Sequence, residues 1–111
     1  MPVLKSDEVQ TTIVREGVQR KLIHAENLMT VVIDFSNGPW NAPDPYHHHV
    51  HEQTTYIATG EIIFFCEDEP EQRLKAGDMF CVPSGKQHTI QLLTEKVTLV
   101  DSFNPVRKDF L

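Results

Sequence analysis

A run of histidines near the middle of the sequence is the first feature that points to chemistry. Four of the six histidines of the chain fall within the five residues from His47 to His51. In an extended backbone successive side chains point to opposite faces, so His47 and His49 would share one face and His48 the other. Neutral imidazoles at positions i and i+2 can chelate one zinc, nickel, copper or iron(II) ion. The run predicts either a metal site or an exposed surface tract.

The same alternation extends the candidate set beyond the first two histidines. Strict parity also places His51 and Gln53 on the face of His47 and His49. A β-bulge before Gln53 would change that parity, and the sequence leaves both arrangements open. His24 has no comparable surroundings and is interpreted as an ordinary strand residue.

Short β-like segments separated by turn residues surround these candidates, and no helical period is present. The expected strands cover residues 11–15, 18–24, 28–35, 46–58, 61–66, 72–75, 79–83, 88–93 and 96–103. Three prolines in residues 36–45 exclude a helix or a central strand there, and Trp40 in that segment is interpreted as a lid or as loop packing. This pattern predicts an all-β sandwich or barrel.

Length and charge exclude several classes of function. A chain of 111 residues fits a single domain, 1–111, without room for a second core. The formal net charge of −6 argues against nucleic-acid binding, but it permits an acidic small-molecule substrate, because local cations can outweigh the global charge. With no apolar leader and no long apolar stretch, we expect a cytoplasmic protein without a membrane partner. Cys66 and Cys81 lie in apolar runs and are interpreted as small buried side chains.

Two spaced motifs show a resemblance to the cupin superfamily across nearly the whole chain. The first motif is His-x-His, a short gap, an acid or amide ligand, six residues and a glycine, matched by His47, His49, Gln53 and Gly60. The second is a glycine, five residues, Pro-x-Gly, two residues and a histidine, matched by Gly77, Pro83, Gly85 and His88. The leading glycine of the first motif is displaced to Gly38. The resemblance implies the cupin double-stranded β-helix, a jelly-roll barrel.

The resemblance also implies one divalent transition metal, nickel, zinc, iron or manganese, with its ligands His47, His49, Gln53 and His88. Gln53 stands where many cupins carry glutamate, which leaves the metal more electrophilic. Glu52 is the alternative ligand, but it would break the six-residue gap to the glycine that follows. Three imidazoles and one amide leave coordination positions open on most first-row metals, as Lewis-acid chemistry requires. His51 would serve as a supporting residue or as pocket wall.

Within the superfamily, the pattern His-x-His-x-x-Glu-Gln and residues 101–111 look like the small cupins of pectin and alginate degradation. That family converts 4,5-unsaturated uronate monosaccharides to linear keto sugars. The resemblance places three residues beside the metal: Asp101 as acid/base, Arg107 as a carboxylate clamp and Phe103 as an apolar wall. The simpler interpretations make Asp101 a surface acid, Phe103 a core residue and Arg107 a solvated tail residue.

Two other functions fit the same motifs. One is a dioxygenase like the flavonol-cleaving cupins, which would need a redox-active metal and a larger, more apolar pocket. The other is a non-catalytic cupin that binds a sugar or another small molecule without turnover. Cupins of this size commonly form homodimers, so residues 1–17 are expected to add a strand to a partner's sheet, with the tail 104–111 near the pocket.

Overall fold

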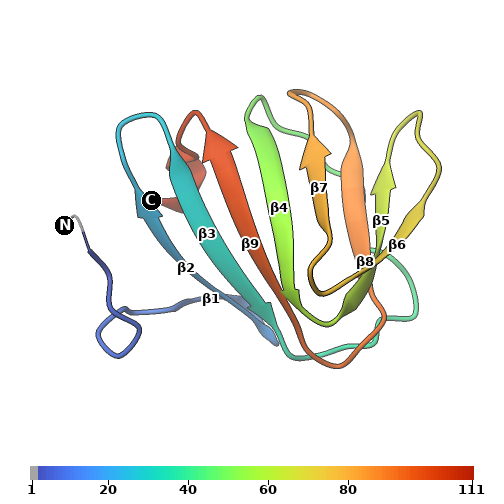
Figure 1. Ribbon diagram of the computed structural model, residues 1–111, viewed down its shortest axis with the longest axis horizontal. Coiled ribbons are helices and arrows are strands. Elements are labelled where there is room, and N and C mark those ends of the chain that lie inside the picture. Colours follow the sequence, from blue (N-terminus) through green and yellow to red (C-terminus); the bar gives the residue numbers. More distant parts are fainter. Residues whose placement is uncertain (1–2) are drawn as a thin grey trace.

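The computed structural model describes residues 3–111 and folds them into two antiparallel sheets (Figure 1). The larger sheet has the order β1-β2-β3-β9-β4-β7, with bounds Thr12–Arg15, Val18–His24, Met29–Phe35, Val97–Asn104, Glu52–Thr59 and Met79–Val82. The smaller sheet has the order β6-β5-β8, with bounds Gln72–Lys75, Glu61–Cys66 and His88–Leu92. A short 3₁₀ helix, η1 (Lys108–Phe110), follows β9. The predicted all-β jelly roll is confirmed, and residues 1 and 2 of the expected N-terminal strand segment lie outside the described residues.

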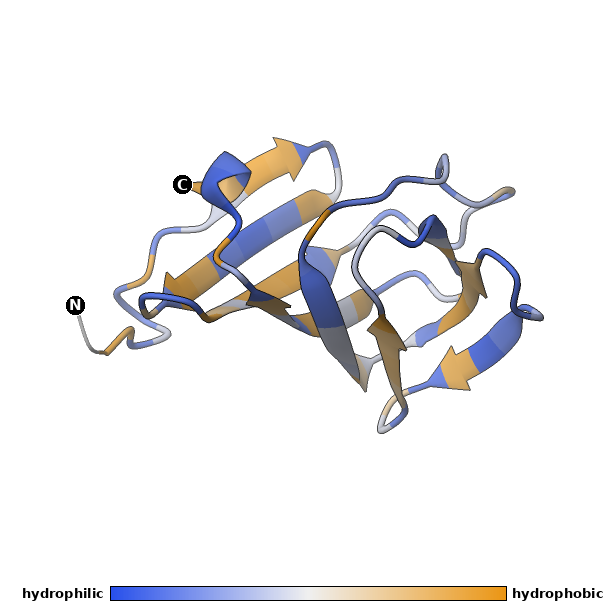
Figure 2. Ribbon diagram, turned by 90° about the horizontal axis from the view of Figure 1, so that it is seen from above, coloured by the Kyte–Doolittle hydropathy of each residue, from blue (hydrophilic) through white to orange (hydrophobic). Residues whose placement is uncertain are grey.

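Alternation along the strands creates the interior, and hydrophobic and hydrophilic stretches alternate along several strands in Figure 2. The inward residues of β9 are Val97, Leu99, Asp101 and Phe103. Register places Asp101 opposite Val31 of β3 on one side and Thr55 of β4 on the other. Asp101 and Thr55 are therefore polar side chains at positions where the pattern alone would put apolar ones.

The apolar core joins the two sheets. Ile57 and Leu99 from the larger sheet belong to the same cluster as Ile62 and Leu92 from the smaller one. Trp40 packs against this cluster, and its indole N–H donates a hydrogen bond to the Asn37 side chain (3.1 Å). Of the two interpretations of Trp40, loop packing describes the structure.

The strand expected over residues 46–58 begins only at Glu52. Residues 46–51 form a loop, in which His47 makes an isolated bridge to His88. Pro43 and Pro45 have no N–H to donate to a ladder, and the chain bends at residues 50–51 before β4. Because of this bend, the regular alternation of side chains that would place His51 on the face of His47 and His49 does not continue.

The interpretation of Cys81 was also wrong. Cys66 is buried as predicted, but Cys81 is exposed, and both thiols are free. Cys81 lies on β7, the edge strand of the larger sheet, opposite Thr54 on the outer face of β4. Alternate side chains of a strand point to opposite faces, so an apolar run can still place a residue on the solvent face, and the run did not determine burial.

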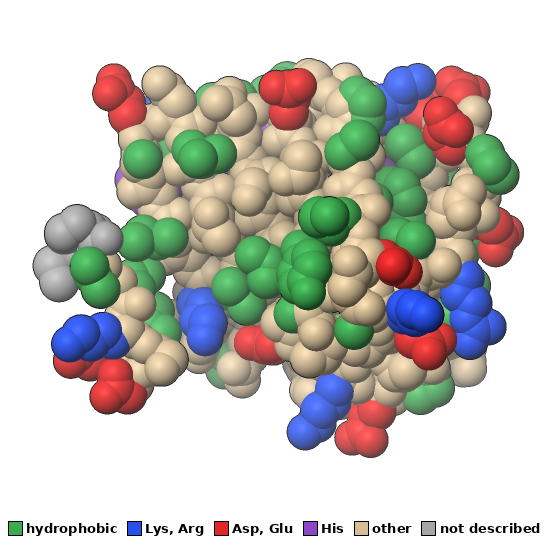
Figure 3. All heavy atoms as spheres, in the orientation of Figure 1, with side chains coloured by type: hydrophobic (Ala, Val, Ile, Leu, Met, Phe, Trp, Pro, Cys, Tyr) green, Lys and Arg blue, Asp and Glu red, His purple; other side chains and the backbone are tan. Residues whose placement is uncertain are grey.

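The exposed charges are of both signs. Acidic and basic side chains are interspersed on the face of the molecule in Figure 3. Among residues 3–111, no helix is long and apolar enough to cross a membrane.

Candidate metal centre

Three histidines from two segments converge at one end of the pocket between the sheets. His47 and His88 exchange both backbone hydrogen bonds (3.1 and 2.9 Å), so their rings lie side by side with centroids 4.2 Å apart. The ring centroid of His49 lies 4.9 Å from that of His88. One ring nitrogen of each histidine lies within 4.8 Å of the other two. This spacing allows the three imidazoles to bind a single ion.

The turn before His88 holds the histidine loop in place. The Gly85 N–H donates a hydrogen bond to the His49 carbonyl (2.8 Å), and the Ser84 hydroxyl donates to the Val50 carbonyl (2.6 Å). Gly85 has φ +80°, a conformation that favours glycine. The two sequence motifs are thus physically joined, because the turn of the second fixes the loop of the first.

Hydrogen bonds at the far ring nitrogens leave lone pairs directed into the centre. His88 Nδ1 lies 2.9 Å from the Lys86 carbonyl and His49 Nδ1 lies 2.9 Å from the His51 carbonyl. A carbonyl only accepts, so each Nδ1 carries the proton and each Nε2 of the neutral ring carries a lone pair. The buried His88 Nε2 has no hydrogen-bond partner among the described residues. These atoms fit a metal, which would accept both lone pairs.

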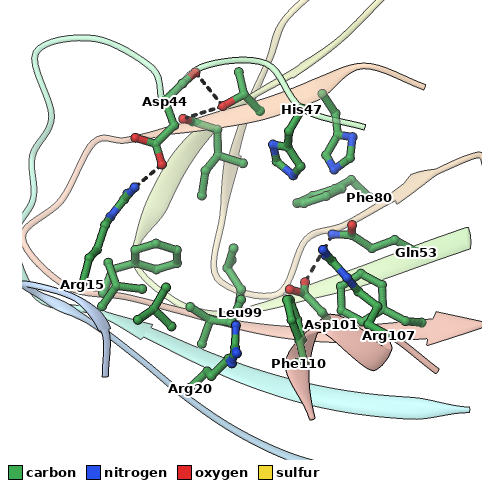
Figure 4. A pocket seen from close by; sticks show the side chains of 18 residues that line it. Arg15, Arg20, Asp44, His47, Gln53, Phe80, Leu99, Asp101, Arg107 and Phe110 are labelled. Atoms are coloured by element: carbon green, nitrogen blue, oxygen red, sulfur yellow. Dashed lines mark hydrogen bonds and ion pairs between the residues drawn. The ribbon is translucent and has the colours of Figure 1, made fainter. Parts of the chain in front are cut away.

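Gln53 adds an oxygen to the same centre. Its Oε1 lies 3.1 Å from His49 Nε2, so two acceptors face each other, an arrangement that a cation between them relieves. Its Nε2 donates to the Thr55 hydroxyl (2.9 Å), which in turn donates to Asp101 Oδ1. Because a carboxylate only accepts, this chain orients the Gln53 amide with its oxygen toward the histidines. Figure 4 shows the direct contact from the same Gln53 nitrogen to Asp101 Oδ1 (3.5 Å).

The alternative ligand, Glu52, is exposed at an outward position of β4. We expect Gln53→Ala to weaken metal affinity by roughly 10-fold or more and Glu52→Ala to leave it unchanged, because only Gln53 reaches the three histidines. Competition with a chromophoric chelator measures both affinities. Gln53→Glu serves as a matched control that retains an oxygen ligand. Weaker binding by Glu52→Ala, with normal binding by Gln53→Ala, would reverse the assignment.

Burial lowers the pKa of all three histidines, and that of His88 falls to about 4. The positive charge of Arg107 acts in the same direction on each. The three rings are therefore neutral near pH 7, and their lone pairs are free for a metal.

A pocket of about 300 Å³ opens beside the histidines. Asp101, Phe103 and Arg107 line it together with His47, His88 and Gln53 (Figure 4). Asp101 is only 4% exposed, and burial raises the pKa of its carboxyl to about 6. Its Oδ1 accepts the hydrogen bonds from Thr55 and Gln53, which leaves Oδ2 for a ligand. The surface-acid interpretation of Asp101 therefore does not describe the structure.

The other two C-terminal candidates also lie at this pocket. Phe103 packs with Met29 and Val31 in a small apolar cluster, so it is a core residue that also forms pocket wall. Arg107 has a side chain only 16% exposed and pairs with Asp109 at 2.8 Å. The tail that carries Arg107 folds back over the pocket rather than extending into solvent.

Of the remaining histidines, His24 and His48 are exposed, whereas the His51 ring centroid lies 5.5 Å from that of His49. His48 is exposed and its Nδ1 lies 3.2 Å from the Gln87 side-chain nitrogen. His51 supports His49 through its backbone carbonyl. His24, at the end of β2, is exposed, as expected of an ordinary strand residue.

Sequence reasoning missed three residues that shape the pocket or its hydrogen bonds. Arg20 and Phe110 line the pocket, and Thr55 links Gln53 to Asp101. Arg20 and Thr55 are polar side chains at inward positions of alternating strands, a signal that was present in the sequence. Phe110 lies in a tail without periodicity, so only the tertiary fold reveals its place.

Comparison with known proteins gives one family and several close relatives. Residues 38–103 match the model of the cupin domain family. A pectin degradation protein, KdgF of Dickeya dadantii (strain 3937), is 33% identical over 106 residues, covering 95% of this chain and 94% of the relative. The structure of KdgF from Halomonas sp. has a TM-score of 0.85 at 33% identity, covering 96% and 97% of the two chains. An RmlC-like cupin from Shewanella frigidimarina NCIMB 400 has a TM-score of 0.88 at 29% identity, covering 100% and 96%.

Proposed function

The chain belongs to the cupin domain family, and from that premise we propose that it is an enzyme that converts 4,5-unsaturated uronate monosaccharides to linear keto sugars. The observation that carries the proposal is the hydrogen-bonded chain from the buried Asp101 through Thr55 to Gln53, at the metal-binding end of a sugar-sized pocket. The chain's identity of 33% to a pectin degradation protein supports the substrate class.

The reaction is an isomerisation in which no atoms are gained or lost. The C1 hydroxyl loses a proton, the bond from C1 to the ring oxygen breaks, and the released enol takes up a proton at C4 as its hydroxyl becomes a ketone. Asp101 is the proposed acid/base, with Oδ2 as the atom that moves the proton. Phe103 forms an apolar wall, and Arg107 supplies positive charge for the uronate carboxylate.

We propose one divalent transition metal, nickel, zinc, iron(II) or manganese, held by His47, His49, Gln53 and His88. A donor set of imidazoles and an amide oxygen suits these ions. When bound, the metal would supply Lewis acidity toward a substrate oxygen. A cytoplasmic location is part of the same proposal.

Pocket size supports a monosaccharide over a flavonol. A volume of about 300 Å³ lies at the lower end of the range of roughly 300–1,000 Å³ for small-molecule sites. A three-ring flavonol would need a larger cavity. The substrate partner is thus a small acidic sugar, and a homodimer formed through the exposed edge strand β1 completes the proposal.

Turnover tests this function directly. Chelator-stripped protein is reloaded with nickel, zinc, iron(II) or manganese, and unsaturated galacturonate is followed by proton NMR. With at least one metal, linear keto sugar is expected to form roughly 10-fold or more faster than without protein, since positioned acid/base groups contribute about 10²–10⁴-fold. Stripped protein is expected to lose this acceleration.

The same experiment also distinguishes the two alternative functions. No acceleration with any metal, by protein shown to be folded, would exclude this function. Oxygen consumption with a flavonol would then indicate a dioxygenase, and sugar binding without turnover would indicate a non-catalytic cupin.

A further inference from the structure

Arg20 is a charged residue that points into the interior from β2. Its neighbours on the same face of the strand are Val18, a buried core residue, and Leu22, which packs on the smaller apolar cluster. Register places Arg20 opposite Ile33 of β3, which in turn lies opposite Leu99 of β9. All three residues of this row line the pocket, and Figure 4 shows the Arg20 side chain directed into it beside Leu99.

Arg20 is a partly buried residue, and its Nε lacks the partner that a buried N–H requires. Within residues 3–111, no carboxylate forms an ion pair with it. Its Nε is buried without any hydrogen-bond partner. The guanidinium carbon of Arg20 lies over the Phe110 ring, 4.0 Å from the ring centroid. Burying the N–H of a cation without a hydrogen-bond partner costs free energy. This cost indicates that the pocket binds a ligand with a hydrogen-bond acceptor for Arg20.

The other two arginines of the pocket are already engaged. Arg15 pairs with Asp44 at 2.7 Å. Arg107 donates from Nε and Nη2 to the two carboxylate oxygens of Asp109, at 3.3 and 2.8 Å. That pairing uses the Nε–Nη2 edge of Arg107 and leaves its end-on Nη1–Nη2 pair for another acceptor. Among the described residues that line the pocket, Arg20 is the arginine without an ion pair.

We propose that Arg20 binds the carboxylate of the substrate, at an anion subsite that Arg20 and Phe110 form together. The proposal rests on the uronate function proposed above and names the residue that selects its acidic substrates. Phe110 holds the guanidinium by stacking and leaves its N–H groups free for a bidentate contact. His47, His88 and Asp101 also line this pocket, and Arg107 retains its end-on Nη1–Nη2 pair for an additional contact.

The test compares an acidic with a neutral sugar by equilibrium binding. Metal-loaded wild-type protein is titrated with galacturonate and with galactose, using NMR shifts to obtain both dissociation constants. Wild-type protein is expected to prefer galacturonate by roughly 10- to 100-fold, since a hydrogen bond to a charged group carries that order of affinity. Arg20→Met keeps the apolar contact with Phe110 but removes the charge, so its preference is expected to fall by roughly 10-fold, to what Arg107 alone supplies.

Matched variants separate binding from structure. Arg20→Lys keeps the charge without the fork, and we expect it to retain part of the preference. Arg73→Met removes an exposed arginine of β6, paired with Glu61 outside the pocket, and is expected to behave as wild type. An Arg20→Met protein that prefers galacturonate as strongly as wild type would overturn the proposal. Equal weakening of both sugars, with a lowered melting temperature, would also overturn it, because it would assign Arg20 a structural role.

The binding test of the Arg20 subsite and the turnover test of the proposed function can fail independently. Turnover of unsaturated galacturonate with an acid preference that ignores Arg20 would overturn only the subsite. An acid preference that depends on Arg20, in a protein without turnover, would support the subsite and exclude the uronate-opening reaction. A wild-type protein that binds the two sugars equally would overturn the subsite, whatever its turnover.

Discussion

Replacing His88 by alanine is expected to abolish metal-dependent stabilisation of the protein. His88 directs a buried, unpartnered Nε2 at the point where the His47 and His49 rings converge, so its loss removes one of the three imidazoles. A ligand present at 100 times its dissociation constant stabilises the native state by about 2.7 kcal/mol. We expect the wild-type melting temperature to rise by several degrees when metal is added, and that of His88→Ala to stay unchanged.

His48→Ala is the matched control for this experiment. It also removes a histidine from the cluster, but His48 is exposed and contacts Gln87 instead of the centre. Thermal unfolding of both variants, with and without added nickel or zinc, checks the prediction. Full metal-dependent stabilisation of His88→Ala would place the metal site elsewhere, whereas its loss in His48→Ala would indicate binding by the exposed histidine tract.

The local pattern of the sequence was sufficient to predict most of the fold. The strand expected over residues 18–24 coincides with β2, and 61–66 with β5, because Gly17 and Gly60 mark turns with positive φ. Motif spacing also brought His47, His49 and His88 together correctly, although it could not show their contacts. A fixed number of residues between turn and ligand sets where the ligand emerges, so spacing carries three-dimensional information.

The local sequence pattern could not predict features that depend on tertiary contacts. The histidine loop departs from a strand because hydrogen bonds from Ser84 and Gly85 replace ladder bonds, and those partners lie more than 30 residues away in sequence. Exposure of Cys81 follows from its place on the outer face of β7, opposite the exposed Thr54, which tertiary packing of the sheet decides. Arg20 was overlooked because a single charge within an alternating strand is commonly a solvated residue.

The inward polar residues of β4 and β9 connect the candidate metal centre to the candidate acid. Burying Gln53, Thr55 and Asp101 at positions suited to apolar side chains costs free energy unless their hydrogen bonds are complete. Here the chain is completed at one end by Asp101 and remains open at the other, where Gln53 Oε1 faces His49. A metal at that end would complete it. This arrangement predicts that Asp101 both orients a ligand and acts on the substrate.

The two roles of Asp101 can be separated by substitution. Asp101→Asn keeps an oxygen that accepts from Thr55 and Gln53, and its nitrogen takes the place of Oδ2, which has no hydrogen bond to the described residues. We therefore expect Asp101→Asn to bind metal as wild type does. Because an amide cannot move the proton, kcat for unsaturated galacturonate is expected to fall by about 10²–10⁴-fold with little change in KM.

Asp101→Ala is expected to lose both metal affinity and turnover. It removes the acceptor that fixes the Thr55 hydroxyl, so Gln53 is no longer held with its oxygen toward the histidines, and metal affinity should fall together with kcat. Thr55→Val breaks the same chain while leaving the carboxyl in place, and it should weaken metal binding more than it changes kcat at saturating metal. Chelator competition and NMR turnover on the three variants measure the two effects independently. Wild-type kcat in Asp101→Asn would assign the proton transfer to another group, and unaltered metal affinity in both Asp101→Ala and Thr55→Val would show that the chain does not position Gln53.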